Sequence, residues 1–517
     1  METTLQQRVS RIGLLAGPAL ALLLYFALPA NYLDAAGKAV PLGHATRATL
    51  AMMVWMATWW MTEAVEIEVT SLLPIAAFPV LGVMPLAATT ASYGADVIYL
   101  FLGGFVLAMA IQRWGLDRRI AFLTLRLVGA RTSAIVAGIM AATAFLSMWV
   151  SNTATAAMMV PIALSVVDLA LLRRTGKTLA QHGGIPQEDV DVRNLALCLL
   201  LGVAYAASIG GLGTIIGSPP NGIFVRFYEQ TYGVQVSFAK WMLVGVPTML
   251  LFLPLAWLLS TRVLFPTKMR EIEGGRAWIH EESEKLGPLS RGELSTLVVF
   301  AFAVFFWVFR PYLAGLSIAG VAPFAKFGDA GIAVTAAIAL FLIPVDRAKG
   351  IFVIDWATAV KLPWGVLILF GGGLALAAAT EANGVAQFIG SLARGFSGWP
   401  VAAVVVVVIA LMVFMSELTS NTAQVATMLP ILAALAPVLG VPPALLLLPA
   451  TIAASCAFMM PVGTPPNAIV FGTGLVRMPQ MMKAGFWLNL AGILLITGIT
   501  YFIVAPLLLT SAGTSAG

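Results

Sequence analysis

Two short polar motifs interrupt apolar stretches of this 517-residue chain and could bind small ions. The sequence Ser-Asn-Thr occurs at Ser151–Thr153 and again at Ser420–Thr422, each time between apolar segments too short to cross a bilayer alone. These residue types favour helix N-caps, and a half-helix that starts at such a cap points its free N–H groups and positive dipole end at the tip. We therefore expect two re-entrant hairpins whose tips attract carboxylates, with spare oxygens for Na⁺.

A second pair of motifs predicts two broken spans. Gly217–Asn221 reads Gly-Ser-Pro-Pro-Asn and Gly463–Asn467 reads Gly-Thr-Pro-Pro-Asn. A residue before proline is pushed to extended backbone, and prolines fit the first positions of a helix because a missing N–H costs nothing there. Each span should therefore stop, run extended for a few residues and restart. Two hairpin tips and two broken spans give four half-helix ends that can surround one cavity.

These motifs belong to an internal repeat. The segment Gly103–Gly115 resembles Gly372–Gly384, and the two Ser-Asn-Thr motifs are separated by the same 269 positions. Ser, Asn and Thr in membrane helices often only pack helices together, and a proline pair alone is usually a kink. Repetition in one order favours a binding role instead. The copies straddle an odd number of predicted crossings, and inverted repeats with interrupted helices are typical of secondary transporters with a site at the repeat interface.

The charge of the expected ligand follows from what the motifs lack. None of the four contains lysine or arginine, so a bound dianion would be stabilised by helix dipoles, hydroxyls and amides. Cations are the natural charge complement, which suggests co-transport with Na⁺.

Composition places the chain in the membrane. Hydrophobic residues make up 60% and charged residues 10%, with a mean hydropathy of +0.95. We predict an all-α polytopic protein with about eleven transmembrane helices and the two hairpins. The clearest apolar runs lie near 12–30, 47–61, 96–112, 194–216, 241–261, 294–312, 329–345, 363–379, 443–461 and 484–508. The predicted parts are an N-terminal segment with the first helix (1–46), a first inverted repeat with the inner hairpin (47–263), a cytoplasmic interfacial linker (264–293), a second inverted repeat with the outer hairpin (294–510) and a tail (511–517).

The basic residues set a predicted orientation with the N-terminus in the cytoplasm. Most lysines and arginines then fall in inside loops, as the positive-inside rule expects, although the inside turn Thr62–Glu68 is acidic. The net charge of +6 is therefore no sign of nucleic-acid binding. A membrane-embedded enzyme would need a nucleophile with a base, or a metal cluster. The spans carry no such constellation of His, Cys or Asp, so we expect neither an enzyme nor an organic cofactor.

At these residues the chain resembles the divalent anion:sodium symporter family, the INDY-type dicarboxylate transporters. The likeness runs from about Thr58 to Phe502 and includes the long signature Ser455–Val470 and its first-half counterpart Ser208–Asn221. The resemblance implies a homodimer in the bacterial inner membrane, each protomer having a scaffold domain and a transport domain that moves as an elevator. It also implies a C4-dicarboxylate substrate such as succinate, malate or fumarate, coupled to Na⁺.

Carried over residue by residue, the resemblance implies two Na⁺ sites and a substrate site between them. One Na⁺ site would use Ser147, Ser151, Asn152 and the Gly217 carbonyl, and its twin Ser416, Ser420, Asn421 and the Gly463 carbonyl. The substrate carboxylates would meet Asn152, Thr153, Ser218, Asn421, Thr422, Thr464 and Pro465.

Several alternatives remain open at this stage. The family includes sodium-independent exchangers, and the same geometry suits sulfate, phosphate or tricarboxylate. A passive channel would conduct without saturating. Glu417, next to the second motif, could sense protons, bind a cation, or support the second Na⁺ site without binding the ion itself.

Overall fold

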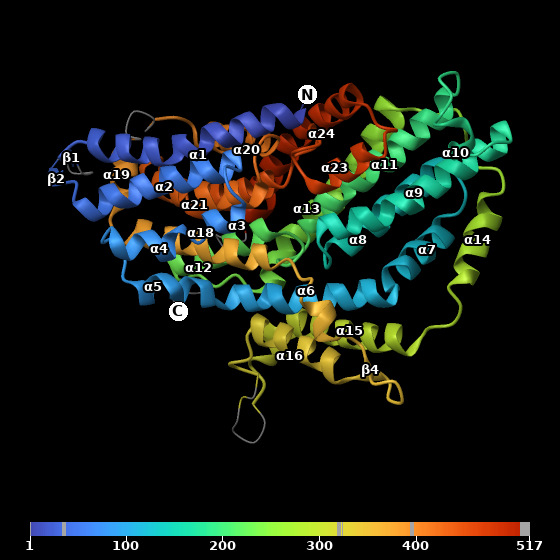
Figure 1. Cartoon of the computed structure of the whole chain (residues 1–517), viewed down its shortest axis with the longest axis horizontal. Coiled ribbons are helices and arrows are strands. Elements are labelled where there is room, and N and C mark those ends of the chain that lie inside the picture. Colours follow the sequence, from blue (N-terminus) through green and yellow to red (C-terminus); the bar gives the residue numbers. More distant parts are fainter. Residues whose placement is uncertain (1, 34–37, 318–321, 323, 393–397, 507–517) are drawn as a thin grey trace.

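The computed structural model shows an elongated bundle of helices (Figure 1). It describes residues 2–33, 38–317, 322, 324–392 and 398–506. The predicted tail, 511–517, lies outside the described residues. Two antiparallel two-stranded pairs, β1 with β2 and β3 with β4, are the sheets found in the described part. The prediction of an all-helical membrane fold is confirmed.

The elements of the N-terminal part and first repeat follow one another with short connections. They are α1 (Glu2–Ala27), β1 (Asn31–Leu33), β2 (Ala39–Pro41), α2 (His44–Thr62), α3 (Ile67–Thr70), α4 (Leu73–Val80), α5 (Leu86–Ala91), η1 (Ser92–Gly94), α6 (Asp96–Trp114), α7 (Leu116–Val128), α8 (Thr132–Ser147), α9 (Asn152–Thr175), α10 (Leu179–His182), α11 (Val190–Gly211), α12 (Pro219–Tyr232), α13 (Phe238–Leu258) and η2 (Leu259–Leu264).

The linker and second repeat continue in the same way. They contain α14 (Gly275–Lys285), α15 (Arg291–Leu313), α16 (Asp329–Leu342), β3 (Pro344–Asp346), β4 (Ile351–Phe352), α17 (Trp356–Ala359), α18 (Trp364–Ala382), α19 (Val385–Leu392), α20 (Val401–Ser416), α21 (Asn421–Val438), α22 (Pro443–Ala454), α23 (Pro465–Gly472), α24 (Met478–Ile499) and η4 (Thr500–Val504).

Helix length and apolarity identify candidate membrane spans in the described part. Nine helical segments in the described part are long and apolar enough to cross a membrane, and two of these are α9 and α21, the second arms of the hairpins. Three shorter apolar segments, α3–α4, α16 and α22, and the 19-residue α2 are the further helices that would complete the predicted eleven spans. The apolar runs 194–216 and 443–461 extend past the observed helix ends at Gly211 and Ala454, because apolarity alone does not mark where the backbone leaves the helix.

The repeat is visible in the helix boundaries. The first hairpin arms, α8 and α20, both have 16 residues and end at Ser147 and Ser416, positions that the repeat equates. The restarted helices α12 and α23 both begin at the first proline of their motif. The repeats also pack crosswise, since α9 contacts α23 and α12 contacts α21. Each hairpin arm that follows a Ser-Asn-Thr motif therefore packs against the restarted helix of the other repeat.

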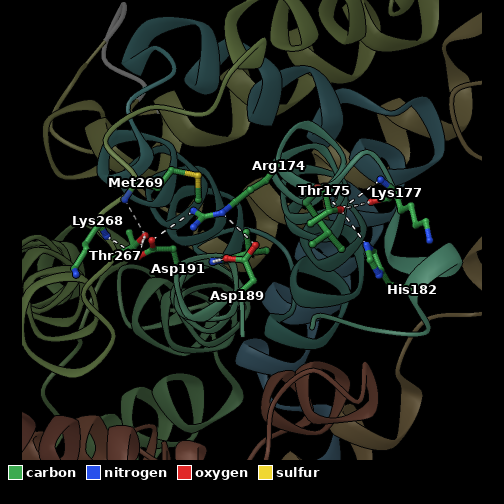
Figure 2. Close-up of polar contacts among 11 residues, drawn as sticks. Arg174, Thr175, Lys177, His182, Asp189, Asp191, Thr267, Lys268 and Met269 are labelled. Carbon is green, nitrogen blue, oxygen red and sulfur yellow. Dashed lines mark hydrogen bonds and ion pairs between the residues drawn. The ribbon is translucent and has the colours of Figure 1, made fainter. Parts of the chain in front are cut away.

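The helix ends on the predicted inner side are joined by polar contacts (Figure 2). Arg174, at the end of α9, lies 3.2 Å from a carboxylate oxygen of Asp189 and 3.4 Å from one of Asp191. Asp191 also accepts a hydrogen bond from the backbone N–H of Lys268 at 2.8 Å. The predicted linker contains α14, whose Trp278 packs on Phe122 of α7. These contacts tie the hairpin exit, the start of α11 and the linker together.

Close packing of the first hairpin against its broken span generates a prediction. A Cβ on Gly210 of α11 would lie 2.3 Å from the Ala144 carbonyl oxygen in α8, so Gly210→Ala should force these helices apart. Overpacking of this kind typically costs about 1–3 kcal/mol. We expect a lower midpoint of thermal unfolding for purified protein. Gly498→Ala in α24 is the control, since nothing lies within 4 Å of its added Cβ. Equal midpoints for the two variants would contradict the packing argument.

Candidate functional site

The first hairpin tip gathers oxygen atoms. Between α8 and α9, Ser151 is the N-cap and its hydroxyl accepts a hydrogen bond from the Ala154 N–H at 3.3 Å. The hydroxyl oxygen of Ser147 lies 2.6 Å from Asn152 Oδ1 and 2.7 Å from the Ala207 carbonyl oxygen. A serine hydroxyl has one hydrogen to donate, so it cannot fully satisfy both acceptors. Such a cluster of hard oxygens suits a small cation.

The first broken span completes this cluster. A Cβ on Gly211, the last residue of α11, would lie 2.6 Å from Asn152 Oδ1 and 3.0 Å from the Gly217 carbonyl oxygen. A side chain at Gly211 would therefore occupy the space that both oxygens face. The structure thus brings Ser147, Asn152 and Gly217 together, with Ser151 at the same tip.

The second hairpin repeats the arrangement with different contacts. Ser416 donates a hydrogen bond to the Met412 carbonyl at 2.6 Å, inside its own helix, and Ser420 is the N-cap of α21. Asn421 Oδ1 is buried, and no hydrogen-bond partner for it lies in the described part of the chain. Gly463 comes close to this tip through Glu417, since its added Cβ would lie 3.2 Å from Glu417 Oε2. The structure therefore places Gly463 beside Glu417, which lies between Ser416 and Ser420 in the sequence, and Ser416 makes no hydrogen bond to Asn421 in the described part.

Glu417 holds the second broken span in place. One carboxylate oxygen accepts hydrogen bonds from the N–H groups of Phe458 and Met459, at 2.8 and 3.0 Å. The other accepts from Met459 and Met460, at 3.0 and 2.9 Å. Asn489 donates its side-chain amide to the first oxygen, at 2.6 Å. These N–H groups belong to the non-helical stretch between α22 and α23. Of the roles that the sequence left open, this geometry favours support of the backbone beside the predicted second Na⁺ site.

The predicted substrate residues all lie at the beginnings of half-helices. Ser218 and Thr464 are the N-caps of α12 and α23, with φ of −146° at both, which is the extended backbone expected before proline. The remaining ones occupy the first turns of α9, α21 and α23: Asn152, Thr153, Asn421, Thr422 and Pro465. Thr153 is exposed and Asn421 and Thr422 are half-buried. The positive ends of four helix dipoles are thus lined by hydroxyl and amide groups.

The sequence analysis missed one pair of residues that the structure makes prominent. Asn221 and Asn467 end the two broken-span motifs, are fully buried, and donate side-chain hydrogen bonds to backbone carbonyls at each break. Their identical place after each proline pair was the available signal.

The sequence of this chain matches a known family of membrane proteins. The sequence profile of one family, described as "Sodium:sulfate symporter transmembrane region", matches residues 33–509. The chain belongs to this family. The predicted resemblance to divalent anion:sodium symporters is therefore confirmed, and with it the class of transporters, as opposed to enzymes.

Individual proteins with similar sequences are also known. A sodium-dependent dicarboxylate transporter, SdcS, of Staphylococcus saprophyticus is 41% identical over 498 residues, which cover 96% of this chain and 92% of the relative. A protein of the same name from Staphylococcus aureus is 40% identical over 494 residues, which cover 95% and 91%.

Solved structures of distant proteins share the fold. The Alcanivorax borkumensis YdaH transporter superposes with a TM-score of 0.54 at 12% identity, covering 97% of this chain and 98% of that one. The Neisseria gonorrhoeae efflux pump MtrF gives a TM-score of 0.50 at 13% identity, covering 93% and 97%. At these identities the likeness concerns the fold alone.

The network at Glu417 generates a second prediction. Glu417→Gln replaces one acceptor oxygen by an NH₂ group that faces backbone N–H donors, so at least one hydrogen bond is lost and a donor meets a donor. We expect a loss of about 1–3 kcal/mol in stability, seen as a lower thermal midpoint of the purified protein. Glu381→Gln, at an exposed position near the end of α18, is the matched control and should unfold as wild type does. Equal stability of both variants would show that Glu417 does not hold the broken span.

Proposed function

We propose that this protein is a secondary active transporter that carries C4-dicarboxylates across the membrane together with Na⁺. The observation that carries the proposal is the cluster of Ser147, Asn152 and Gly217 oxygens at the start of a half-helix, repeated in outline at Ser416–Asn421. The relatives named sodium-dependent dicarboxylate transporters support both the ion and the substrate class.

The proposed Na⁺ sites follow the two hairpins. One uses Ser147, Ser151, Asn152 and the Gly217 carbonyl, and the other Ser416, Ser420, Asn421 and the Gly463 carbonyl. Neutral oxygens of this kind are hard ligands that suit Na⁺, and such ligands occur in other transporters at unwound backbone and half-helix ends.

The substrate would lie between the two ions. Its carboxylates would meet the residues at the four half-helix starts, Asn152, Thr153, Ser218, Asn421, Thr422, Thr464 and Pro465. Opposite charges a few ångströms apart attract strongly in a low-dielectric interior. Each bound Na⁺ would therefore increase the affinity for the dianion, and the dianion that for Na⁺.

The proposal extends to the domains, the dimer and the membrane location of the protein. The hairpins and broken spans, together with the span that follows each broken one, would form the transport domain, which is α8–α13 and α20–α24, and the remaining spans the scaffold of a homodimer. The dense contacts of α11 with α8 and α9, and of α22 with α20 and α21, support the first grouping. We propose a bacterial inner-membrane location with a cytoplasmic N-terminus, supported by the distribution of lysine and arginine and by the staphylococcal relatives.

Uptake by proteoliposomes tests the function. Purified protein should accumulate radiolabelled succinate with an inward Na⁺ gradient and not with choline in place of Na⁺. Excess unlabelled malate or fumarate should compete, whereas sulfate should not. Uptake that is the same in Na⁺ and choline would indicate a sodium-independent exchanger, and competition by sulfate, phosphate or citrate would indicate another anion.

Substitution of the hairpin serines tests the ion sites. Ser147→Ala and Ser416→Ala each remove one oxygen and should raise the Na⁺ concentration for half-maximal succinate uptake by about threefold to tenfold, the effect of roughly one hydrogen bond's worth of free energy. Ser165→Ala is the control, because its exposed hydroxyl also bonds to its own helix but lies away from the tip. Unchanged Na⁺ dependence in both tip variants would reduce these serines to packing residues.

Substitution of the tip asparagines tests whether both hairpins are needed. Asn152→Ala and Asn421→Ala should each abolish succinate uptake, since each removes an amide proposed to contact both an ion and the substrate. Size-exclusion chromatography should show that the purified variants keep the wild-type assembly. Wild-type uptake by either variant would contradict the paired site.

A further inference from the structure

Two asparagines make the same pair of hydrogen bonds in the two repeats. The side-chain amide nitrogen of Asn221 lies 2.9 Å from the Gly211 carbonyl oxygen and 2.8 Å from that of Thr214. That of Asn467 lies 3.0 Å from the Ala457 carbonyl oxygen and 2.9 Å from that of Met460. In both cases the acceptors precede the asparagine by ten and seven positions. Sequence repetition alone does not require this agreement, because the side chains at the acceptor positions differ.

The broken backbone explains why an amide is needed there. Where α11 ends at Gly211, the last carbonyls have no following helical N–H to bind them. The next helix begins with Pro219 and Pro220, which have no N–H to donate. A buried carbonyl without a partner is costly, and a side-chain NH₂ group supplies two donors at once. Asn221 thus ties the last turn before the break to the first turn after it.

The backbone that Asn221 binds lies beside the proposed ion site. Gly211, whose carbonyl Asn221 binds, is the residue whose added Cβ would meet both Asn152 Oδ1 and the Gly217 carbonyl oxygen. The break therefore folds so that Gly217 returns to the hairpin tip. Both asparagines are 0% exposed, and their own Oδ1 atoms have no hydrogen-bond partner in the described part of the chain. Each side chain is thus engaged through its donors, which are directed at the break.

We propose that Asn221 and Asn467 are positioning residues of the two Na⁺ sites. Each fixes the loop that carries the coordinating carbonyl, Gly217 in the first repeat and Gly463 in the second. The inference rests on the proposed sodium coupling. It adds two residues that do not bind the ion but position the backbone that does. Groups that orient metal ligands typically contribute about tenfold to a hundredfold in affinity.

The test measures succinate uptake against Na⁺ concentration for Asn221→Ala and Asn467→Ala. Each should raise the Na⁺ concentration for half-maximal uptake by about tenfold, with uptake recovering toward the wild-type maximum at high Na⁺. The double variant should require more Na⁺ than either single one. A residue that only stabilised the fold would lower maximal uptake, through less active protein, and leave the half-maximal Na⁺ concentration unchanged. That second result would overturn the inference.

Asn383→Ala is the matched control. Asn383 also donates its amide to two oxygens, Thr49 Oγ1 at 2.9 Å and the Val83 carbonyl at 3.0 Å, but these lie in α2 and in the connection between α4 and α5, and neither belongs to a broken span. Its loss should leave the Na⁺ dependence unchanged, so a tenfold shift in this variant too would overturn the assignment.

Two further measures keep the test decisive. If an alanine variant is not recovered as folded protein, Asn221→Ser and Asn467→Ser keep one polar hydrogen, which cannot bind both carbonyls, and a shift in the same direction is expected. Wild-type protein is assayed in Na⁺ and choline alongside. Sodium-independent uptake by wild type would refute the proposed function, whereas sodium-dependent wild type with unshifted variants would refute this inference alone.

Discussion

A helix that breaks inside a membrane leaves backbone polar groups without partners, and most of this structure answers that constraint. Hydrocarbon offers no replacement for a lost hydrogen bond, so non-helical backbone at membrane depth must be satisfied by protein or by a bound polar ligand. At the breaks between α11 and α12 and between α22 and α23, side chains take up part of this demand. Thr214 donates to the Met148 carbonyl, Asn221 and Asn467 bind carbonyls, and Glu417 accepts N–H groups. The oxygens and dipole ends that remain are what the proposed ions and substrate would use.

The two repeats satisfy the backbone groups at their breaks with partly equivalent and partly different side chains. Hairpin arms of equal length and two equivalent asparagines reflect a common plan. Glu417 breaks the symmetry, because Met148 stands at the equivalent position of the first repeat. Besides its asparagine, the second break is thus held by a carboxylate and the first by Thr214. Two sites built from the same motif therefore have different electrostatic surroundings.

Much of this could be predicted from sequence because the decisive signals are local. N-cap preference placed the starts of α9 and α21 within the two Ser-Asn-Thr motifs, and the proline pairs placed the starts of α12 and α23. The bonds of Glu417 could not be predicted in the same way, since its partners lie 41 to 72 positions along the chain and meet it only through tertiary packing. For the same reason the sequence did not reveal that Gly211 faces Asn152. The ion and substrate residues, the domain boundaries and the dimer remain predictions.

The central claim is that a site without basic side chains binds a dianion only when sodium ions accompany it. Thermal unfolding of the purified protein tests this directly, because a ligand that binds the folded state raises its unfolding midpoint. Succinate should raise the midpoint in NaCl and leave it unchanged in KCl or choline chloride of equal ionic strength. An equal rise in all three salts would show that the half-helix ends bind the dianion without sodium, and would contradict the account.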